Sequence, residues 1–362
     1  MMKKLTVLFL MFSFVFLLCV SKTNAQEKTD VEKWLENFKL SAGVDVYYAW
    51  DTDREKSLRQ FTSISPFRDE FRLNIAQVSV NYNSEAVRGV FTLQYGDIPK
   101  VNWFTASPSI QEANIGFKLY KDLWLDAGYF ITHIGFETFP RNNYFSSFTL
   151  QSYYEPFYQS GIKLSYDFIK KFTASLYLLN GYNVIEDNNK NKSAGLQLVY
   201  APDDIFKFTY NNIIGNEQPN TLPGKTRILN NFIVGFTGPC GKMEALLGLD
   251  FDYQEKSKLS DSSAGAYTYG AMLSMKYKIS PKFSAQLRGE FFQDLDGVYS
   301  GVLANNIGMK GNGITVGCEF NPVEQGYVRL EARYLSLDKN LNIFYDGSNT
   351  RTEVIFSTGF SY

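Results

Sequence analysis

Histidine and cysteine are almost absent from this chain. Its only histidine, His133, cannot form a metal centre that needs several histidines, nor a His–His catalytic pair. Beyond the first 25 residues only Cys240 and Cys318 remain. Cys240 lies in a predicted turn and Cys318 four predicted strands further on. Because strands lie about 4.8 Å apart, no disulfide is expected between them. The sequence predicts no metal, no cofactor and no disulfide framework.

Long apolar runs are also missing, except at the N-terminus. Lys3 and Lys4 precede the apolar run 5–20, which is followed by the small and polar residues 21–25. This order predicts a signal peptide over residues 1–25 and a mature chain that begins at Gln26. A bulky Leu18 before Cys19 favours an ordinary signal peptide over a lipoprotein signal. No second run approaches the roughly 18 apolar residues of a membrane-spanning helix.

An excess of charge of either sign is missing as well. The chain has 36 Lys and Arg against 37 Asp and Glu, a net charge of -1. Removal of residues 1–25 takes away three Lys and no acid, so the mature chain carries -4. This balance excludes nucleic acid as an expected partner. Aromatic residues are abundant instead, with 24 Tyr and 31 Phe.

The last twelve residues show the pattern that organises the rest of the chain. Thr352, Val354, Phe356, Thr358, Phe360 and Tyr362 alternate with Arg351, Glu353, Ser357, Gly359 and Ser361, and Ile355 is the exception. Such alternation predicts a strand with one apolar and one wet face, and about ten residues cross a bilayer when tilted. Phe360 and the terminal Tyr362 resemble the C-terminal aromatic signal that outer-membrane barrels present to the barrel assembly machinery.

Alternating segments of this kind recur sixteen times between residues 38 and 362. Short turns and long polar loops follow one another between them, and many apolar faces end in Tyr, Phe or Trp. This organisation predicts an all-β, antiparallel, up-and-down transmembrane barrel of about 16 strands, with short periplasmic turns and long extracellular loops. A soluble all-β repeat or sandwich is the alternative, but its strands are typically about 5–6 residues long. Residues 26–37 are expected to be a short amphipathic or mobile lead-in, and 38–362 the barrel in the outer membrane of a Gram-negative bacterium.

The inner face and one loop contain the candidate site residues. A barrel of this size encloses a lumen that side chains alone do not fill, so we expect water and a polar, mixed-charge wall. The segment 131–156 is long, aromatic and poor in charge, which favours folding into the lumen as a constriction over an outer cap or a partner-binding loop. The expected pore-lining or constricting residues are His133, Glu137, Arg141, Glu155, Arg288, Glu290, Arg329, Glu331 and Arg333. We expect the last five, on neighbouring hairpins, to form a ladder of ion pairs.

Enzymatic chemistry finds little support in these residues. A serine hydrolase needs only one histidine, but no G-x-S-x-G turn accompanies His133. The run Asp294-Leu-Asp-Gly297 lacks the third acid and the distal Glu of a calcium loop, so a turn is the better interpretation. We expect no catalytic residue.

Several short motifs resemble one known family. They are Pro140-Arg-Asn-Asn-Tyr144, Glu155-Pro-Phe-Tyr158 with Gly161, Asn180-Gly-Tyr-Asn183, the run 188–192, Arg288-Gly-Glu-Phe-Phe-Gln-Asp294 with Asp296-Gly297, and Arg329-Leu-Glu-Ala-Arg333. Together they are similar to the OmpL-like group of outer-membrane β-barrel porins, although Tyr182 stands where Trp is expected and Gln159 where His is common. The resemblance implies a pore in the outer membrane and specifies no substrate.

Two functions from different classes follow from these expectations. The first is a passive channel for small hydrophilic solutes or ions, in contact with outer-membrane lipid and either single or associated as a homotrimer. The second is a closed or plugged barrel that serves as a surface adhesin or scaffold. Solute flux distinguishes them.

Overall fold

The computed structural model describes residues 34–54, 57–187 and 189–362. The predicted signal peptide, with Cys19, and most of the predicted lead-in lie outside the described residues. Residues 34–37 form a helical turn, in which the rings of Trp34 and Phe38 lie 4.7 Å apart, edge to face. Residues 39–362 form a separate unit, and the description below concerns that unit.

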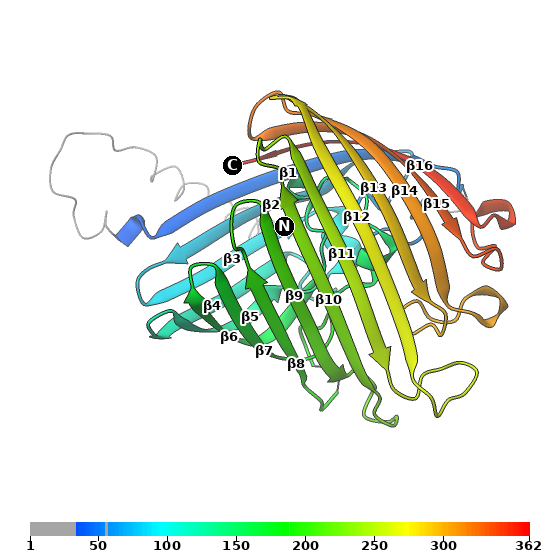
Figure 1. The fold of residues 1–362 in the computed structure, drawn as a ribbon, viewed down its shortest axis with the longest axis horizontal. Coiled ribbons are helices and arrows are strands. Elements are labelled where there is room, and N and C mark those ends of the chain that lie inside the picture. Colours follow the sequence, from blue (N-terminus) through cyan, green and yellow to red (C-terminus); the bar gives the residue numbers. More distant parts are fainter. Residues whose placement is uncertain (1–33, 55–56, 188) are drawn as a thin grey trace, which may run out of the picture. The chain divides into compact units, whose positions relative to one another are not determined.

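Sixteen strands close into one antiparallel barrel, as the sequence predicts (Figure 1). Each strand pairs with its neighbours in the chain. They are β1 (Phe38–Asp51), β2 (Phe71–Asn83), β3 (Val87–Tyr95), β4 (Ile110–Tyr120), β5 (Leu123–Ile131), β6 (Tyr158–Ile169), β7 (Phe172–Leu179), β8 (Ser193–Tyr200), β9 (Phe206–Asn216), β10 (Thr226–Thr237), β11 (Met243–Gln254), β12 (Ala266–Ser280), β13 (Phe283–Asp294), β14 (Met309–Phe320), β15 (Gly326–Leu337) and β16 (Thr350–Ser361).

Helical structure is confined to short segments within the long loops. These are α3 (Asp97–Asn102), α4 (Leu150–Tyr154) and the 3-10 turns η1 (Pro140–Asn142), η2 (Ala304–Asn306) and η3 (Tyr345–Gly347). No helix in the described part of the chain is both long and apolar enough to cross a bilayer.

The first and last strands close the cylinder. Gly43 pairs with Ser361 and Asp51 with Glu353, in an unbroken antiparallel register. The backbone of Tyr362 extends this ladder, because its N–H and C=O both bond to Ala42, at 2.8 and 2.9 Å. Closure leaves neither of these two strands as an open edge.

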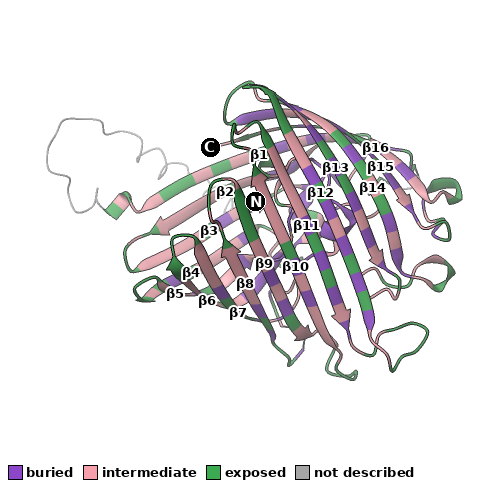
Figure 2. Cartoon of the chain, in the orientation of Figure 1, coloured by how far each residue is buried: buried purple, intermediate pink, exposed green. Residues whose placement is uncertain are grey.

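Side chains alternate between the two faces of the wall, and Figure 2 shows the resulting stripes along β12 to β14. On β13, Phe283 and Leu287 are exposed on the outer face, whereas Ser284 and Arg288 are buried on the inner face. The outer face is apolar and the inner face polar, because a bilayer cannot solvate charges and an aqueous interior can. Ile355, the exception in the terminal strand, packs inside the barrel against Tyr47 and Ala49.

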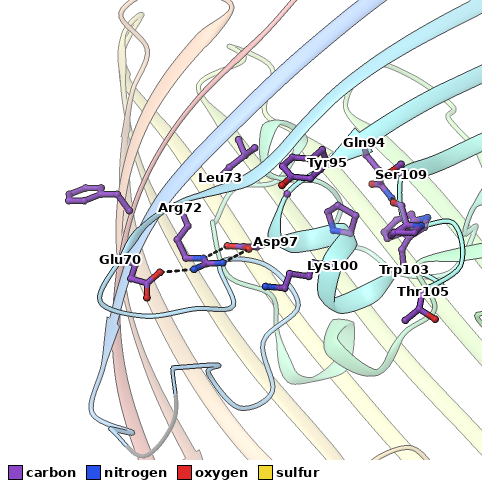
Figure 3. A pocket seen from close by; sticks show the side chains of 14 residues that line it. Glu70, Arg72, Leu73, Gln94, Tyr95, Asp97, Lys100, Trp103, Thr105 and Ser109 are labelled. Atoms are coloured by element: carbon purple, nitrogen blue, oxygen red, sulfur yellow. Dashed lines mark hydrogen bonds and ion pairs between the residues drawn. The ribbon is translucent and has the colours of Figure 1, made fainter. Parts of the chain in front are cut away.

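The wall is modified where β3 ends. Gly96 turns the chain inward with φ 138°, and a Cβ there would lie 2.6 Å from the Asn74 carbonyl oxygen. The helix α3 follows, and its Asp97 carboxylate accepts hydrogen bonds from Arg72 at 2.6 and 2.9 Å (Figure 3). The same carboxylate accepts a hydrogen bond from the Tyr47 hydroxyl at 2.9 Å. A cavity of about 570 Å³ lies beside this ion pair, with Tyr95 and Trp103 among its lining.

Candidate functional site

The segment between β5 and β6, residues 132–157, lies inside the barrel, and we call it the inner loop. Near its start, Gly135 N donates to Asn231 on β10. Further along, Arg141 donates to the Glu324 carbonyl oxygen at 2.8 Å. Glu324 belongs to the short turn between β14 and β15, at the opposite end of the barrel from the base of the loop. The inner loop therefore descends through the lumen and returns to β6.

Buried ionic contacts fasten the inner loop to the wall. Glu137 accepts a hydrogen bond from Arg288 on β13 at 2.6 Å, and the two side chains are 1% and 0% exposed. The same carboxylate accepts from the Thr149 N–H at 2.6 Å and from its hydroxyl at 2.8 Å. Arg288 also donates to the Ser147 carbonyl oxygen at 2.7 Å. These contacts hold both limbs of the loop to one strand.

Neighbouring strands supply further anchors. Glu290 accepts from Arg333 at 2.7 and 2.9 Å and from the Leu150 N–H at 2.8 Å. Glu331 accepts from the Ser146 N–H at 2.5 Å. Arg329 pairs with Glu319 at 2.6 Å and donates to the carbonyl oxygens of Pro140 and Asn143. The five charged residues predicted on β13 and β15 thus lie between the wall and the inner loop. Of the predicted ladder, only Arg288, Glu290 and Arg333 pair with one another.

Their burial differs from the wet inner wall that the sequence suggests. Arg288, Arg329, Arg333, Glu290 and Glu331 are each at most 8% exposed. Alternation identifies the face of the wall that a side chain occupies, but not what covers that face. Here the backbone amides and carbonyls of the inner loop replace water as hydrogen-bond partners.

The loop between β1 and β2 adds a second set of buried charges. Arg59 pairs with Asp51 at 2.8 Å and with Glu353 on β16. Glu353 also pairs with Arg333 and Arg351, at 3.1 and 3.0 Å. Neither Arg59 nor Arg351 was among the site residues predicted from the sequence, because their pairing depends on segments far apart in the chain.

Five glycines in the wall receive inner-loop side chains. An added Cβ at Gly248 would lie 2.2 Å from the Phe136 ring, and one at Gly270 2.3 Å from the Gln151 amide. The other three glycines, Gly195, Gly311 and Gly317, similarly face His133, Leu150 and Phe145, at 2.9 to 3.2 Å. Glycine is required at Gly248 and Gly270 because the loop fills the space that a side chain would need. A series of inward glycines is a signal by which sequence reasoning could have located the packed wall.

His133 fastens the beginning of the inner loop. Its Nε2 lies 3.1 Å from the Asn212 carbonyl oxygen, and its Nδ1 lies 2.9 Å from the side-chain amide oxygen of Gln159. The ring stacks on Tyr177 with centroids 4.0 Å apart. Burial lowers the pKa of His133, because it disfavours the charged form of the ring. Both ring nitrogens are engaged with an amide and a carbonyl, an arrangement suited to packing and not to activating a serine.

The end of the inner loop meets an acidic group on β11. Gln151 donates to Asp250, and the Glu155 carboxyl lies in hydrogen-bond contact with the same Asp250. Burial and the charge of Asp250 raise the pKa of Glu155 well above its ordinary value of 4.5. Asp252 follows on the same strand and accepts from the Asn230 N–H at 3.1 Å. No group of acids, cysteines or histidine suited to a metal ion is found among the described residues.

Asp294, at the start of the predicted turn, has a local structural role. Its carboxylate accepts the N–H groups of Val298, Tyr299 and Ser300, each at 2.8 Å. All these contacts bind the following loop to the end of β13.

Two cavities lie on either side of the inner loop along the barrel. At the long-loop end a cavity of about 560 Å³ is lined by residues of several loops, including Phe61, Tyr154, Glu155 and Tyr182. At the short-turn end a cavity of about 410 Å³ is lined by the inner faces of β1 to β6, with Lys39, Arg88, Glu112, Asp126 and Lys163 as its charged groups. The polar wall that remains open is therefore opposite the strands that hold the inner loop.

A family match covers nearly the whole described barrel. Residues 37–362 match the family described as "Putative beta-barrel porin-2, OmpL-like". The chain belongs to this family. A search of curated proteins found no match for this OmpL-like porin sequence.

Solved outer-membrane porins share the fold of this OmpL-like chain. The anion-selective porin from Comamonas acidovorans is 10% identical, with a TM-score of 0.61 over 90% of this chain and 99% of that one. The channel DcaP of Acinetobacter baumannii is 11% identical, with a TM-score of 0.63 over 90% and 97%. OmpT of Vibrio cholerae, in a structure described as a trimer form, is 12% identical, with a TM-score of 0.56 over 90% and 99%. The family match and this shared fold together identify the molecule as an outer-membrane β-barrel with a porin-like channel fold.

Proposed function

We propose that this chain is a passive outer-membrane channel for small hydrophilic solutes or ions, narrowed by the inner loop. The observation that carries the proposal is the asymmetry of the lumen. Buried contacts fasten the loop to the inner faces of β10 to β16, whereas a polar cavity persists against β1 to β6. Solutes would pass on the side that the loop leaves free.

The charges of the open side suggest the kind of solute. Arg88 forms a bidentate pair with Asp126 at 2.6 and 2.5 Å, and Lys163 lies 3.5 Å from the same carboxylate. Lys39 and Glu112 add one charge of each sign to this lining. A mixed wall of this kind gives a transverse field and modest ion preference, with size as the main criterion. No covalent chemistry is proposed.

Two measurements test this proposal. Purified protein in a planar bilayer should give discrete conductance steps, and liposomes that contain it should swell in sugars at rates that fall as sugar size rises. Absence of both steps and swelling would overturn the channel proposal. That outcome would favour the second function, a plugged barrel whose loops bind a partner at the cell surface.

Orientation and assembly follow from the same proposal. The long loops would face the cell exterior and the short turns the periplasm, after removal of residues 1–25. Phe360 and Tyr362, which are 52% and 80% exposed on the closing strand, would serve as the assembly signal. Association of three barrels is proposed by analogy with the trimer form of OmpT, and cross-linking in native membranes would detect it.

A further inference from the structure

The cavity at the long-loop end, which we call the vestibule, has an aromatic lining drawn from four loops. Phe61 comes from the β1–β2 loop, Tyr153, Tyr154 and Phe157 from the inner loop, Tyr182 from the β7–β8 loop and Tyr299 from the β13–β14 loop. Several rings stand nearly at right angles. Phe61 meets Tyr153 at 90° and 5.9 Å, and Tyr153 meets Tyr154 at 80° and 4.9 Å. The cavity is thus bordered by aromatic rings whose faces point in different directions.

The hydrogen-bond donors of the vestibule are largely engaged within the protein. The Gln60 amide nitrogen donates to Asp53 and to the Ile343 carbonyl oxygen, both at 3.0 Å. The Asn102 amide nitrogen likewise donates to the carbonyl oxygens of Ser63 and Ile98, at 2.7 and 2.8 Å. Both N–H groups of each amide are therefore used, which leaves their carbonyl oxygens as acceptors.

Two further donors of the lining are engaged in the same way. Arg59 directs its guanidinium to Asp51, Glu353 and the Ser65 carbonyl oxygen. The Tyr182 hydroxyl donates to the Tyr154 carbonyl oxygen at 2.5 Å. Around these four side chains, a ligand that offers donors and positive charge would thus find more partners than one that needs donors from the protein.

A carboxyl group lies at the base of this lining. Glu155 is 6% exposed, and its Oε1 has no hydrogen-bond partner among the described residues. The acids that face Glu155 are Asp250 on β11 and Glu137 on the inner loop, and each of them disfavours a charged Glu155. A cation in the vestibule would relieve this repulsion, so Glu155 would give up its proton as the cation binds.

A guanidinium group already occupies part of the same surface. Arg227 lies over the rings of Tyr299 and Tyr182, 4.7 and 5.7 Å from their centroids. It donates to Gln254 and offsets the charge of Asp252. The strongest partners of Glu155 and Asp250 are acids, amides and a hydroxyl, with no guanidinium among those described. These tyrosines therefore form a surface that accommodates a cation, with acid charge left over beside it.

We propose that the vestibule binds a small organic cation with an ammonium head group, held against the aromatic faces with Glu155 as its counter-ion. The volume of about 560 Å³ is in the range of small-molecule sites. This inference rests on the proposed function in one respect: if the chain is a channel, the bound cation could pass on into the lumen. Binding itself requires no flux.

Calorimetric titration of the full-length mature protein in detergent micelles tests the inference. The probes are choline and its neutral carbon isostere, 3,3-dimethylbutan-1-ol, with glucose as a neutral polar probe. Choline should bind on the order of tenfold more tightly than the isostere. Equal affinity of the two, or preferential binding of glucose, would overturn the inference.

Variants assign the binding to the vestibule. Glu155→Gln and Tyr153→Leu should each weaken choline binding several-fold. Glu70→Gln and Tyr345→Leu, which alter an exposed acid and an exposed tyrosine elsewhere, should leave it unchanged. Choline affinity of the Glu155→Gln and Tyr153→Leu proteins equal to that of the parent would exclude the vestibule as the site.

Failure of this inference is separable from failure of the channel proposal. Choline binding without conductance in a planar bilayer would reject the channel and keep the cation site. Conductance with no choline binding would keep the channel and reject the cation site.

Discussion

Neutralising Glu137 should release the inner loop from the barrel wall. The Glu137→Gln substitution keeps the shape of the side chain but removes the charge that faces Arg288. That guanidinium is 0% exposed, and its next carboxylate, Glu290, lies 4.0 Å away and already binds Arg333. The Arg288 charge would remain buried with poor compensation.

The size of the effect follows from the burial of the Arg288 charge. Removal of one partner of a buried ion pair costs about 3–5 kcal/mol. The glutamine can still accept a hydrogen bond from Thr149, so the lower value of about 3 kcal/mol applies. This corresponds to roughly a 150-fold shift from the docked to the undocked loop. Glu70→Gln is the matched control, because Glu70 is 56% exposed and such pairs contribute about 0–1 kcal/mol.

Single-channel recording and limited proteolysis measure the release. The Glu137→Gln channel should show larger and noisier currents, and its inner loop should be cleaved faster than that of the parent. Glu137→Gln/Arg288→Met removes both charges and should behave more like the parent than the single variant does. Glu137→Gln currents and cleavage rates equal to those of Glu70→Gln would refute the anchoring role.

Three further predictions concern other parts of the barrel. Gly248→Ala should displace the Phe136 ring, which packs on this glycine, and should raise the noise of the channel current. Gly289→Ala is the control, because its added Cβ would meet nothing within 4 Å. Equal current noise in the two variants would contradict the close packing. Deletion of Phe360 and Tyr362 should lower the amount of inserted protein before it changes conductance, and normal outer-membrane levels would count against an assembly signal. Because the pKa of Glu155 is raised in the folded protein, its neutral form stabilises the fold below its ordinary value of 4.5, and this contribution is lost as pH rises. Resistance to heat should therefore fall as the pH rises above about 4.5 in the parent, and fall less in Glu155→Gln; parallel profiles would exclude this group as the cause.

The barrel itself was predictable because its pattern is local. Apolar and polar residues alternate within each strand, and a bilayer outside with water inside enforces that alternation along the whole chain. The prediction of sixteen strands, with the last one closing on the first, is confirmed. The length and aromatic content of segment 131–156 also directed attention to the loop that lies in the lumen.

The partners of the site residues were less predictable because they lie far apart in the sequence. Arg288 was expected to line a wet wall, yet it pairs with Glu137, 151 residues away in the sequence. The link from Arg59 to Glu353 requires the β1–β2 loop to turn inward, which no periodicity encodes. Inward glycines such as Gly248 and Gly270 could have indicated where the inner loop packs, because each leaves space on the wall that a loop side chain fills.

The single-channel conductance of a variant lacking residues 137–152 tests the constricting role of the inner loop most directly. Ile131 and Tyr158 are paired at the base of the loop, so the shortened connection can still join β5 to β6. Deletion of residues 258–263, in the exposed loop between β11 and β12, is the control. We expect larger conductance steps for the 137–152 deletion and unchanged steps for the control. Parent-sized steps from a properly inserted 137–152 deletion would contradict the assignment of the inner loop as the constriction.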